Sequence, residues 1–121
     1  MMKYEVTVVD IGELAKKFFN EGTVVLFSKK EMPLEMKEIS VMHNGGKLYE
    51  DIKAGDKLYI GEKVYTVTAV GEKANSNLRL MGHVCLKFDN EKSAKMPGYI
   101  HLERDSEPFC IEIGQKIRVE S

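Results

Sequence analysis

The chain has 121 residues and a formal net charge of −1, from 18 Lys and Arg against 19 Asp and Glu. This length allows one domain with its own core. The near-neutral charge excludes a nucleic-acid binder that depends on a basic face. No segment approaches the roughly 20 apolar residues that cross a bilayer, and the first ten residues lack the pattern of a signal peptide. We therefore expect a cytoplasmic protein in which Cys85 and Cys110 are free thiols.

The first half of the chain alternates between strand-like and helix-like patterns. Residues 4–9 alternate apolar and polar side chains, as a half-buried strand does. Residues 10–22 space their apolar side chains along one helical face. In this segment Asp10 and Glu13 are placed to form a capping box, and Gly22 is placed to end the helix. Further strands are predicted at 22–27, 40–43 and 52–60.

The second half repeats this order after a short turn. Gly61 and Glu62 separate two alternating segments, which predicts a two-residue hairpin that joins both halves in one sheet. A strand at 65–70 follows. The next helix, within 71–82, is predicted to be weaker because Asn75 and its two polar neighbours lower helix propensity. Three more strands are predicted, around 82–88, 96–101 and 111–119.

Three segments recur in the two halves in the same order, which indicates a tandem duplication. The matches are YEVTVV (4–9) with YTVTAV (65–70), GTVVLF (22–27) with GHVCLK (82–87), and IKAGDKLYI (52–60) with IEIGQKIRV (111–119). The offsets are 61, 60 and 59 residues, so only small insertions or deletions separate the copies.

The order of elements predicts a mainly β fold with short helical crossovers. We expect residues 1–121 to form one domain, a closed or partly open β-barrel built from copies at about 4–60 and 65–119 around a pseudo-twofold axis. A half of this size buries too little surface to be stable alone, and closure removes exposed sheet edges.

The three histidines are the candidate reactive groups. His43 and His101 occupy equivalent places in the two copies, whereas Thr23 stands at the position equivalent to His83. A histidine on a strand is more often a surface or hydrogen-bonded residue than a catalyst. His101 has charged neighbours and no loop chemistry beside it, and His83 follows a glycine that allows close approach.

His43 has the most distinctive surroundings, because Asn44, Gly45 and Gly46 follow it directly. Asn-Gly is itself a hairpin signal. Glycines at a strand end also allow successive backbone N–H groups to converge on an anion. We therefore expect His43 at an exposed rim of the sheet, as a neutral nucleophile beside free N–H groups that support a phosphate. Alternation does not show which face is the core here, because apolar residues lie on both faces.

Several other kinds of site lack their sequence patterns. The chain contains no G-x-x-x-x-G-K-[ST] phosphate loop, no H-E-x-x-H or C-x-x-C zinc pattern, and no G-x-S-x-G serine motif. Its carboxylates are scattered through charged loops, and its seven methionines are irregularly spaced, as core filler is.

The segment TAVGEKANSNLRLMGHVCLKFD (68–89), followed by MPGYIH (96–101), resembles the glucitol/sorbitol-specific IIA component of the bacterial phosphotransferase system (PTS). Members of this family have a similar TAVG turn, an NL pair, a glycine-histidine that opens a strand, and a PG before the next strand. Their phosphorylated histidine ends a strand before a short glycine-containing loop, which is where His43 stands.

The resemblance implies a cytosolic phosphocarrier without a cofactor or metal. His43 would accept a phosphoryl group from the carrier HPr and pass it to a cysteine of IIB, and the membrane component IIC would give it to sorbitol. His83 would assist by binding the phosphoryl oxygens or the His43 ring.

Two other interpretations remain open from the sequence. One is a small metal-dependent enzyme whose ligands are His43, His83 and His101 with a cysteine, although separations of 40 and 18 residues match no known ligand spacing. The other is a non-enzymatic β-barrel interaction module in which the histidines are incidental.

Overall fold

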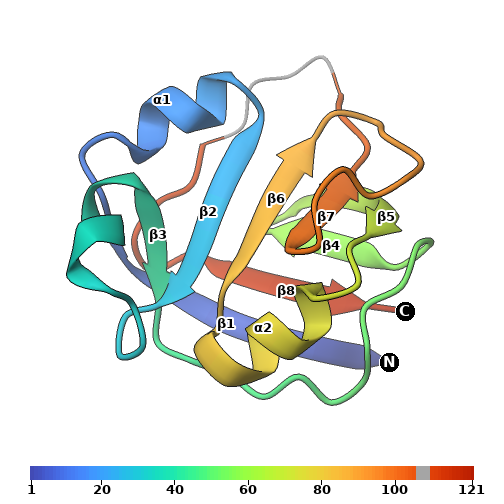
Figure 1. The fold of residues 1–121 in the computed structure, drawn as a ribbon, viewed down its shortest axis with the longest axis horizontal. Coiled ribbons are helices and arrows are strands. Elements are labelled where there is room, and N and C mark those ends of the chain that lie inside the picture. Colours follow the sequence, from blue (N-terminus) through green and yellow to red (C-terminus); the bar gives the residue numbers. More distant parts are fainter. Residues whose placement is uncertain (106–109) are drawn as a thin grey trace.

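The computed structural model describes residues 1–105 and 110–121, and within these residues eight strands close into one barrel (Figure 1). Around the barrel the strand order is β1-β3-β2-β6-β7-β5-β4-β8. The strands are β1 (Met2–Ile11), β2 (Thr23–Ser28), β3 (Ser40–His43), β4 (Lys57–Ile60), β5 (Lys63–Val70), β6 (Val84–Phe88), β7 (Tyr99–Leu102) and β8 (Lys116–Glu120). The predicted mainly β barrel is confirmed, and it is the closed form.

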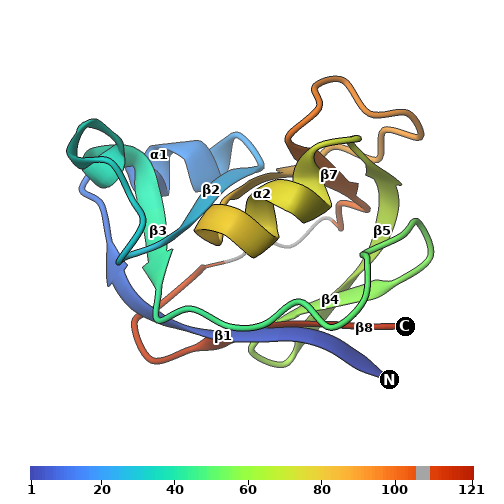
Figure 2. The same cartoon turned by 60° about the horizontal axis from the view of Figure 1, so that its bottom comes forward.

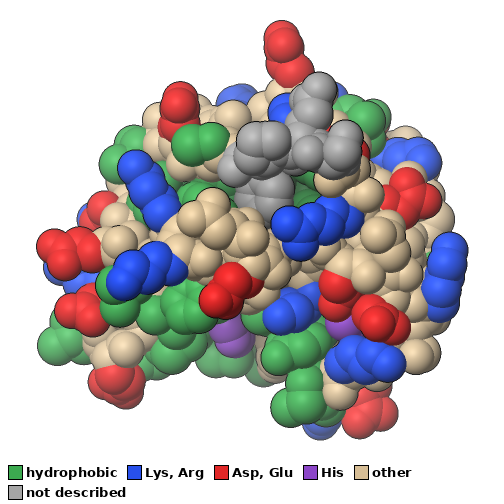
Figure 3. Space-filling model, turned by 90° about the horizontal axis from the view of Figure 1, so that it is seen from above, with side chains coloured by type: hydrophobic (Ala, Val, Ile, Leu, Met, Phe, Trp, Pro, Cys, Tyr) green, Lys and Arg blue, Asp and Glu red, His purple; other side chains and the backbone are tan. Residues whose placement is uncertain are grey.

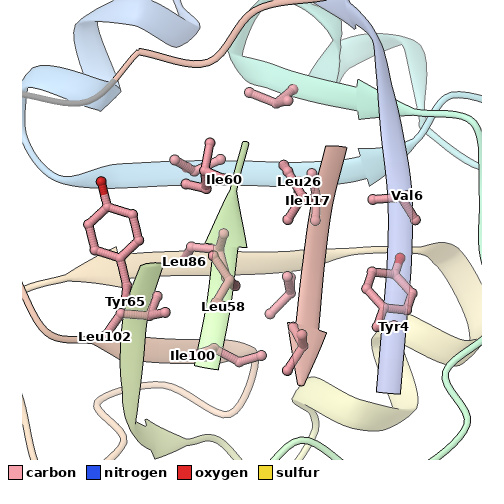
Figure 4. Packing of buried hydrophobic residues seen from close by; sticks show 14 of the residues in the cluster. Tyr4, Val6, Leu26, Leu58, Ile60, Tyr65, Leu86, Ile100, Leu102 and Ile117 are labelled. Atoms are coloured by element: carbon pink, nitrogen blue, oxygen red, sulfur yellow. The ribbon is translucent and has the colours of Figure 1, made fainter. Parts of the chain in front are cut away.

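The core consists of the inward-facing residues of the strands, which alternate with exposed or half-exposed ones in β5, β6 and β8, whereas every residue of β2 and β3 is buried. Side chains from opposite sides of the barrel point toward one another (Figure 4). The labelled residues are Tyr4, Val6, Leu26, Leu58, Ile60, Tyr65, Leu86, Ile100, Leu102 and Ile117, all buried. Burial of one such aliphatic side chain stabilises the fold by about 1.5–3 kcal/mol.

Two helices and a 3-10 helix form the crossovers. They are α1 (Ala15–Asn20), α2 (Ala74–Met81) and η1 (Leu34–Ile39). The two α-helices lie at opposite ends of the β2–β6 pair (Figure 1), and Figure 2 shows α2 crossing the near end of the barrel. Among the described residues, no helix has the length and apolar character needed to pass through a bilayer.

The predicted capping box of the first helix is wrong. Asp10 and Ile11 belong to β1, where they pair with β3, and Asp10 Oδ1 accepts a hydrogen bond from the Ile11 N–H at 2.9 Å. The helix begins later, after Leu14, and no side chain caps its first turn. In this arrangement Asp10 and Ile11 are part of the ladder with Met42 and Val41 instead of the first turn of a helix. Gly22 follows the helix with a φ of +76°, as predicted for its end.

The hairpin between the two halves is confirmed. Ile60 pairs with Lys63, and Gly61 adopts the left-handed conformation at φ +60°. The alternative hairpin at Asn44 is not formed, because β3 is followed by a long connection to β4.

The strand order is unchanged when β1–β4 are exchanged with β5–β8. Within the described part of the chain, four antiparallel pairings join the halves, and in two of them, β2–β6 and β4–β8, the residues that the sequence repeat aligns face each other, at Val25–Cys85 and Tyr59–Arg118. A tandem duplication predicts this arrangement. The duplication itself stays a prediction, and superposition of residues 4–60 on 65–119 tests it.

Candidate functional site

His43 is the last residue of β3, and its side chain points into one end of the barrel. It lies opposite Val8 of β1 and Ser28 of β2 in the strand register. The Tyr4 ring meets the imidazole edge to face, with centroids 6.3 Å apart and an interplanar angle of 87°. His43 is 0% exposed. The prediction that it stands at an exposed rim is therefore wrong for this conformation of the protein.

Both ring nitrogens of His43 have hydrogen-bond partners. Nε2 lies 2.8 Å from the Gly82 carbonyl oxygen, which can only accept, so Nε2 carries the proton. The Gly45 N–H donates to Nδ1 at 2.9 Å, which requires a lone pair there. The ring is thus a neutral Nε2–H tautomer. Desolvation by burial lowers its pKa, although the Gly82 bond opposes this effect.

The glycine loop after His43 does not present free N–H groups as expected. The Asn44 N–H donates to the Thr7 carbonyl at 3.1 Å, and Asn44 Oδ1 accepts from the Thr7 N–H at 3.0 Å. The Gly45 N–H is bound to the imidazole. Gly46 packs so closely on β1 that a Cβ would lie 2.5 Å from the Glu5 carbonyl oxygen. The loop continues alongside β1, and this contact uses the groups that an anion would need.

The cover over Nε2 is the C-terminal end of α2. Gly82 caps this helix in the left-handed conformation, at φ +61°. A Cβ at Gly82 would lie 2.6 Å from His43 Cε1 and 2.8 Å from both His43 Nε2 and Ser28 Cβ. Only a glycine fits there, so backbone rather than a side chain closes the site. Sequence analysis noted this glycine but missed its contact with His43, which is 39 residues away.

Ser28 is a member of the site that sequence analysis also missed. It shares a barrel face with the buried Leu26, pairs with His43 in the register, and is 8% exposed. No hydrogen bond joins its Oγ to any residue in the part of the chain that is described. The hydroxyl is therefore an available donor beside the imidazole.

His83 directly follows Gly82 in the sequence, but its ring lies apart from the ring of His43. Its Nδ1 donates to the Leu26 carbonyl oxygen at 2.9 Å, and the ring stacks on Phe27 with centroids 4.1 Å apart. No hydrogen bond to Nε2 is found in the part of the chain that is described, and the side chain is partly exposed. No hydrogen bond joins the two histidine rings among the described residues.

His101 is also buried, at the equivalent position of the second half. Its Nδ1–H lies 2.9 Å from the Asp89 carboxylate, and its Nε2 accepts from the Lys95 N–H at 3.2 Å. These contacts tie the loop after β6 to β7. Within residues 1–105 and 110–121, no group of three His, Cys, Asp or Glu side chains is arranged to hold a metal.

Acid is expected to lower the free energy of unfolding, because the buried His43 ring binds a proton less readily than it does in the unfolded chain. The folded-state pKa lies below the unfolded value of 6.5, so the unfolded chain binds the proton more readily. This contribution is present above about pH 6.5 and is lost as the pH falls through the lowered folded pKa. Urea unfolding at about pH 7.5 and about pH 5 should show a larger loss for the wild type than for His43→Gln. An equal loss in both proteins would contradict the burial of this ring.

Gly82→Ala is expected to destabilise the protein by its collision with His43 as well as by backbone strain. The left-handed conformation alone costs about 1–3 kcal/mol in a non-glycine residue. Gly114→Ala is the matched control, since Gly114 has φ +93° with no atom within 4 Å of its Cβ position. Urea unfolding should show a greater loss for Gly82→Ala than for Gly114→Ala. Equal losses would mean that the Gly82–His43 contact is not tight.

The comparisons with known proteins agree on one family. The family model that matches is described as "PTS system glucitol/sorbitol-specific IIA component", and the match covers residues 3–118. The chain is 33% identical to the PTS glucitol/sorbitol-specific EIIA components of Shigella flexneri and Escherichia coli (strain K12). Each of these alignments covers 99 residues, 82% of this chain and 80% of the relative.

A solved structure shows the same fold. The crystal structure of a PTS system IIA component from Enterococcus faecalis V583 matches with a TM-score of 0.79 at 27% identity, covering 97% of this chain and 99% of that one. At that coverage the match extends over the barrel as a whole. From its sequence and its fold together, the chain belongs to the glucitol/sorbitol-specific IIA family of the bacterial phosphotransferase system.

Proposed function

We propose that this protein is a cytoplasmic phosphocarrier that holds a phosphoryl group on His43. The donor is the phosphohistidine of HPr, and the acceptor is a cysteine of the IIB component, which serves sorbitol uptake through the membrane component IIC. Membership of the IIA family supports the carrier role, and the position of His43 at the end of β3 supports the choice of histidine.

The observation that carries this proposal is a neutral imidazole whose two ring nitrogens are each hydrogen-bonded to the backbone of a glycine. Burial lowers the pKa of His43, so a ring lone pair stays available at neutral pH. Gly45 covers Nδ1 and Gly82 covers Nε2. Displacing the end of a short helix or a surface loop opens the site without repacking the core.

The transfer needs little besides position and charge stabilisation. A lone pair of the His43 ring attacks phosphorus, the N–P bond of the donor breaks, and the donor imidazole takes its electron pair. In the second step the IIB thiolate attacks phosphorus, and the electron pair of the breaking bond returns to His43. A phosphohistidine is already activated, so neither step consumes a nucleotide.

The attacking nitrogen must first lose its present partner. Attack by Nε2 requires its proton to move to Nδ1, so both the Gly82 carbonyl and the Gly45 N–H must leave, whereas attack by Nδ1 requires only the Gly45 N–H to leave. Nε2 is the ring nitrogen farther from the main chain of His43, and it faces the Gly82 carbonyl and, at 3.5 Å, the Tyr4 hydroxyl. It is therefore the nitrogen that an incoming donor reaches once the end of α2 moves.

When the end of α2 has moved away from His43, the groups beside the ring can contact the phosphoryl group. The Gly45 and Gly46 N–H groups and the Asn44 side chain support phosphoryl oxygens only once they leave their present contacts with the His43 ring and β1. His83 brings a second imidazole on the adjacent segment. On the face in Figure 3, which is viewed from the side opposite α2 in Figure 1, acidic, basic and apolar side chains are interspersed rather than separated.

Intact mass spectrometry tests this function. The protein is incubated with phosphoenolpyruvate, enzyme I and HPr, and its mass is measured before and after acid. We expect a gain of one phosphoryl group that acid removes, because phosphohistidine is acid-labile. No gain from a donor system that phosphorylates a known IIA protein would exclude the carrier function.

A further inference from the structure

We propose that the Gly82–His83 end of α2 is a latch that is closed by the His43 imidazole and opened by its phosphorylation. This inference rests on the proposed function, with Nε2 as the attacked nitrogen. It goes beyond that function in one respect: the last turn of α2 takes one position in the empty protein and another in the phosphorylated protein.

A hydrogen bond from a side chain holds the latch. The Gly82 carbonyl oxygen, at the C-terminal end of α2, accepts from His43 Nε2–H at 2.8 Å in a site sealed from water. Helix C-terminal carbonyls need such partners when they are buried. A phosphoryl group on Nε2 replaces the donated proton and brings negative oxygens to the place of Gly82. The bond is then lost, and the remaining contact becomes repulsive.

The corresponding end of α1 is fixed in a different way. There the Gly22 carbonyl oxygen accepts from the backbone N–H of Phe88, at 2.8 Å. No change of side-chain chemistry removes this bond. The two helices thus end on equivalent glycines, and only α2 ends on a group that can be modified.

The rest of α2 is anchored independently, so the motion is confined to its last turn. Asn75 exchanges hydrogen bonds with both the N–H and the carbonyl of Ile52, at 2.8 and 3.1 Å. Ala74 and Leu78 are buried in the core. Beyond them, Leu80 is 73% exposed. When Gly82 leaves His43, the surface around Leu80 changes, and a partner can distinguish the charged carrier from the empty one.

Amide hydrogen exchange tests the latch on the wild-type protein, with and without phosphoryl transfer from HPr. We expect the amides that close α2, those of Gly82 and His83, to exchange about tenfold faster in the phosphorylated protein, as loss of one buried hydrogen bond predicts. The Gly22 and Phe88 amides at the end of α1 are the internal control and should not change.

The two failures are distinguishable. If intact mass shows the phosphoryl group but the exchange of the α2 amides is unchanged, the latch is overturned and the carrier function stands. The same holds if the α1 amides change equally, since the effect is then global. If no phosphoryl group is taken up, the proposed function itself fails.

Discussion

His43→Gln is expected to lower phosphoryl uptake from HPr by a factor of about 10³ or more, because it removes the nucleophile that forms the new bond. The glutamine amide can still donate to the Gly82 carbonyl, so the closed conformation is retained. Uptake is measured as the rate of mass gain in the phosphoenolpyruvate, enzyme I and HPr system.

His101→Gln is the matched control for this variant. It changes the same residue type at an equally buried position, 0% exposed in both cases, but its ring is hydrogen-bonded to Asp89 and Lys95 rather than to Gly82. We expect it to accept the phosphoryl group at close to the wild-type rate. Equal loss in the two variants would indicate damage to the barrel rather than loss of a nucleophile.

His83→Gln is the decisive third variant, because His83 is the more accessible histidine. As a supporting residue it should slow transfer only by a factor of about 10–100. If His83→Gln abolishes uptake and His43→Gln retains it, the roles of the two residues are reversed.

The largest effect on stability is expected from Asp56→Ala. The Lys3 ammonium lies 2.8 Å from Asp56 Oδ2, and both side chains are almost fully buried, at 5% and 9% exposure. The same carboxylate oxygen also accepts from the Lys53 N–H at 2.8 Å. Removing the carboxylate leaves a buried cation with only the Asp51 carbonyl oxygen, at 3.0 Å, and no opposite charge, which costs about 3–5 kcal/mol.

Chemical denaturation measures this loss, and Glu91→Ala is the control. Glu91 pairs with Lys95 at 3.5 Å, but both side chains are about half exposed, so its loss should cost no more than about 0.5 kcal/mol. Similar small losses for the two variants would contradict the view that the Lys3–Asp56 pair fastens β1 to the segment before β4.

The sequence predicted the barrel because its strands carry a regular signal. Alternation in segments such as 4–9 and 65–70 identifies inward-facing residues without knowledge of the partners. The Gly61–Glu62 turn is also local, and it was predicted correctly. Local signals misled where pairing overrides them, since Asp10 has the character of a helix cap but lies in β1.

The burial of His43 under the end of α2 could not be predicted from the sequence, for a physical reason. The burial of His43 depends on Gly82, which reaches it only through the parallel pairing of β2 with β3 and the placement of α2. Apolar residues lie on both faces near His43, so alternation gives no direction for its side chain. The glycine loop was noticed for its conformational freedom, but contacts with β1 determine where its N–H groups point.

The central claim is that residue 43 carries the phosphoryl group although its ring is buried in the empty protein. Fragmentation mass spectrometry of the phosphorylated wild-type protein, kept at alkaline pH to preserve the N–P bond, locates the modification most directly. We expect the phosphoryl group on the fragment that contains His43. Its presence on the fragment with His83 or His101, with His43 unmodified, would exclude His43 as the carrier.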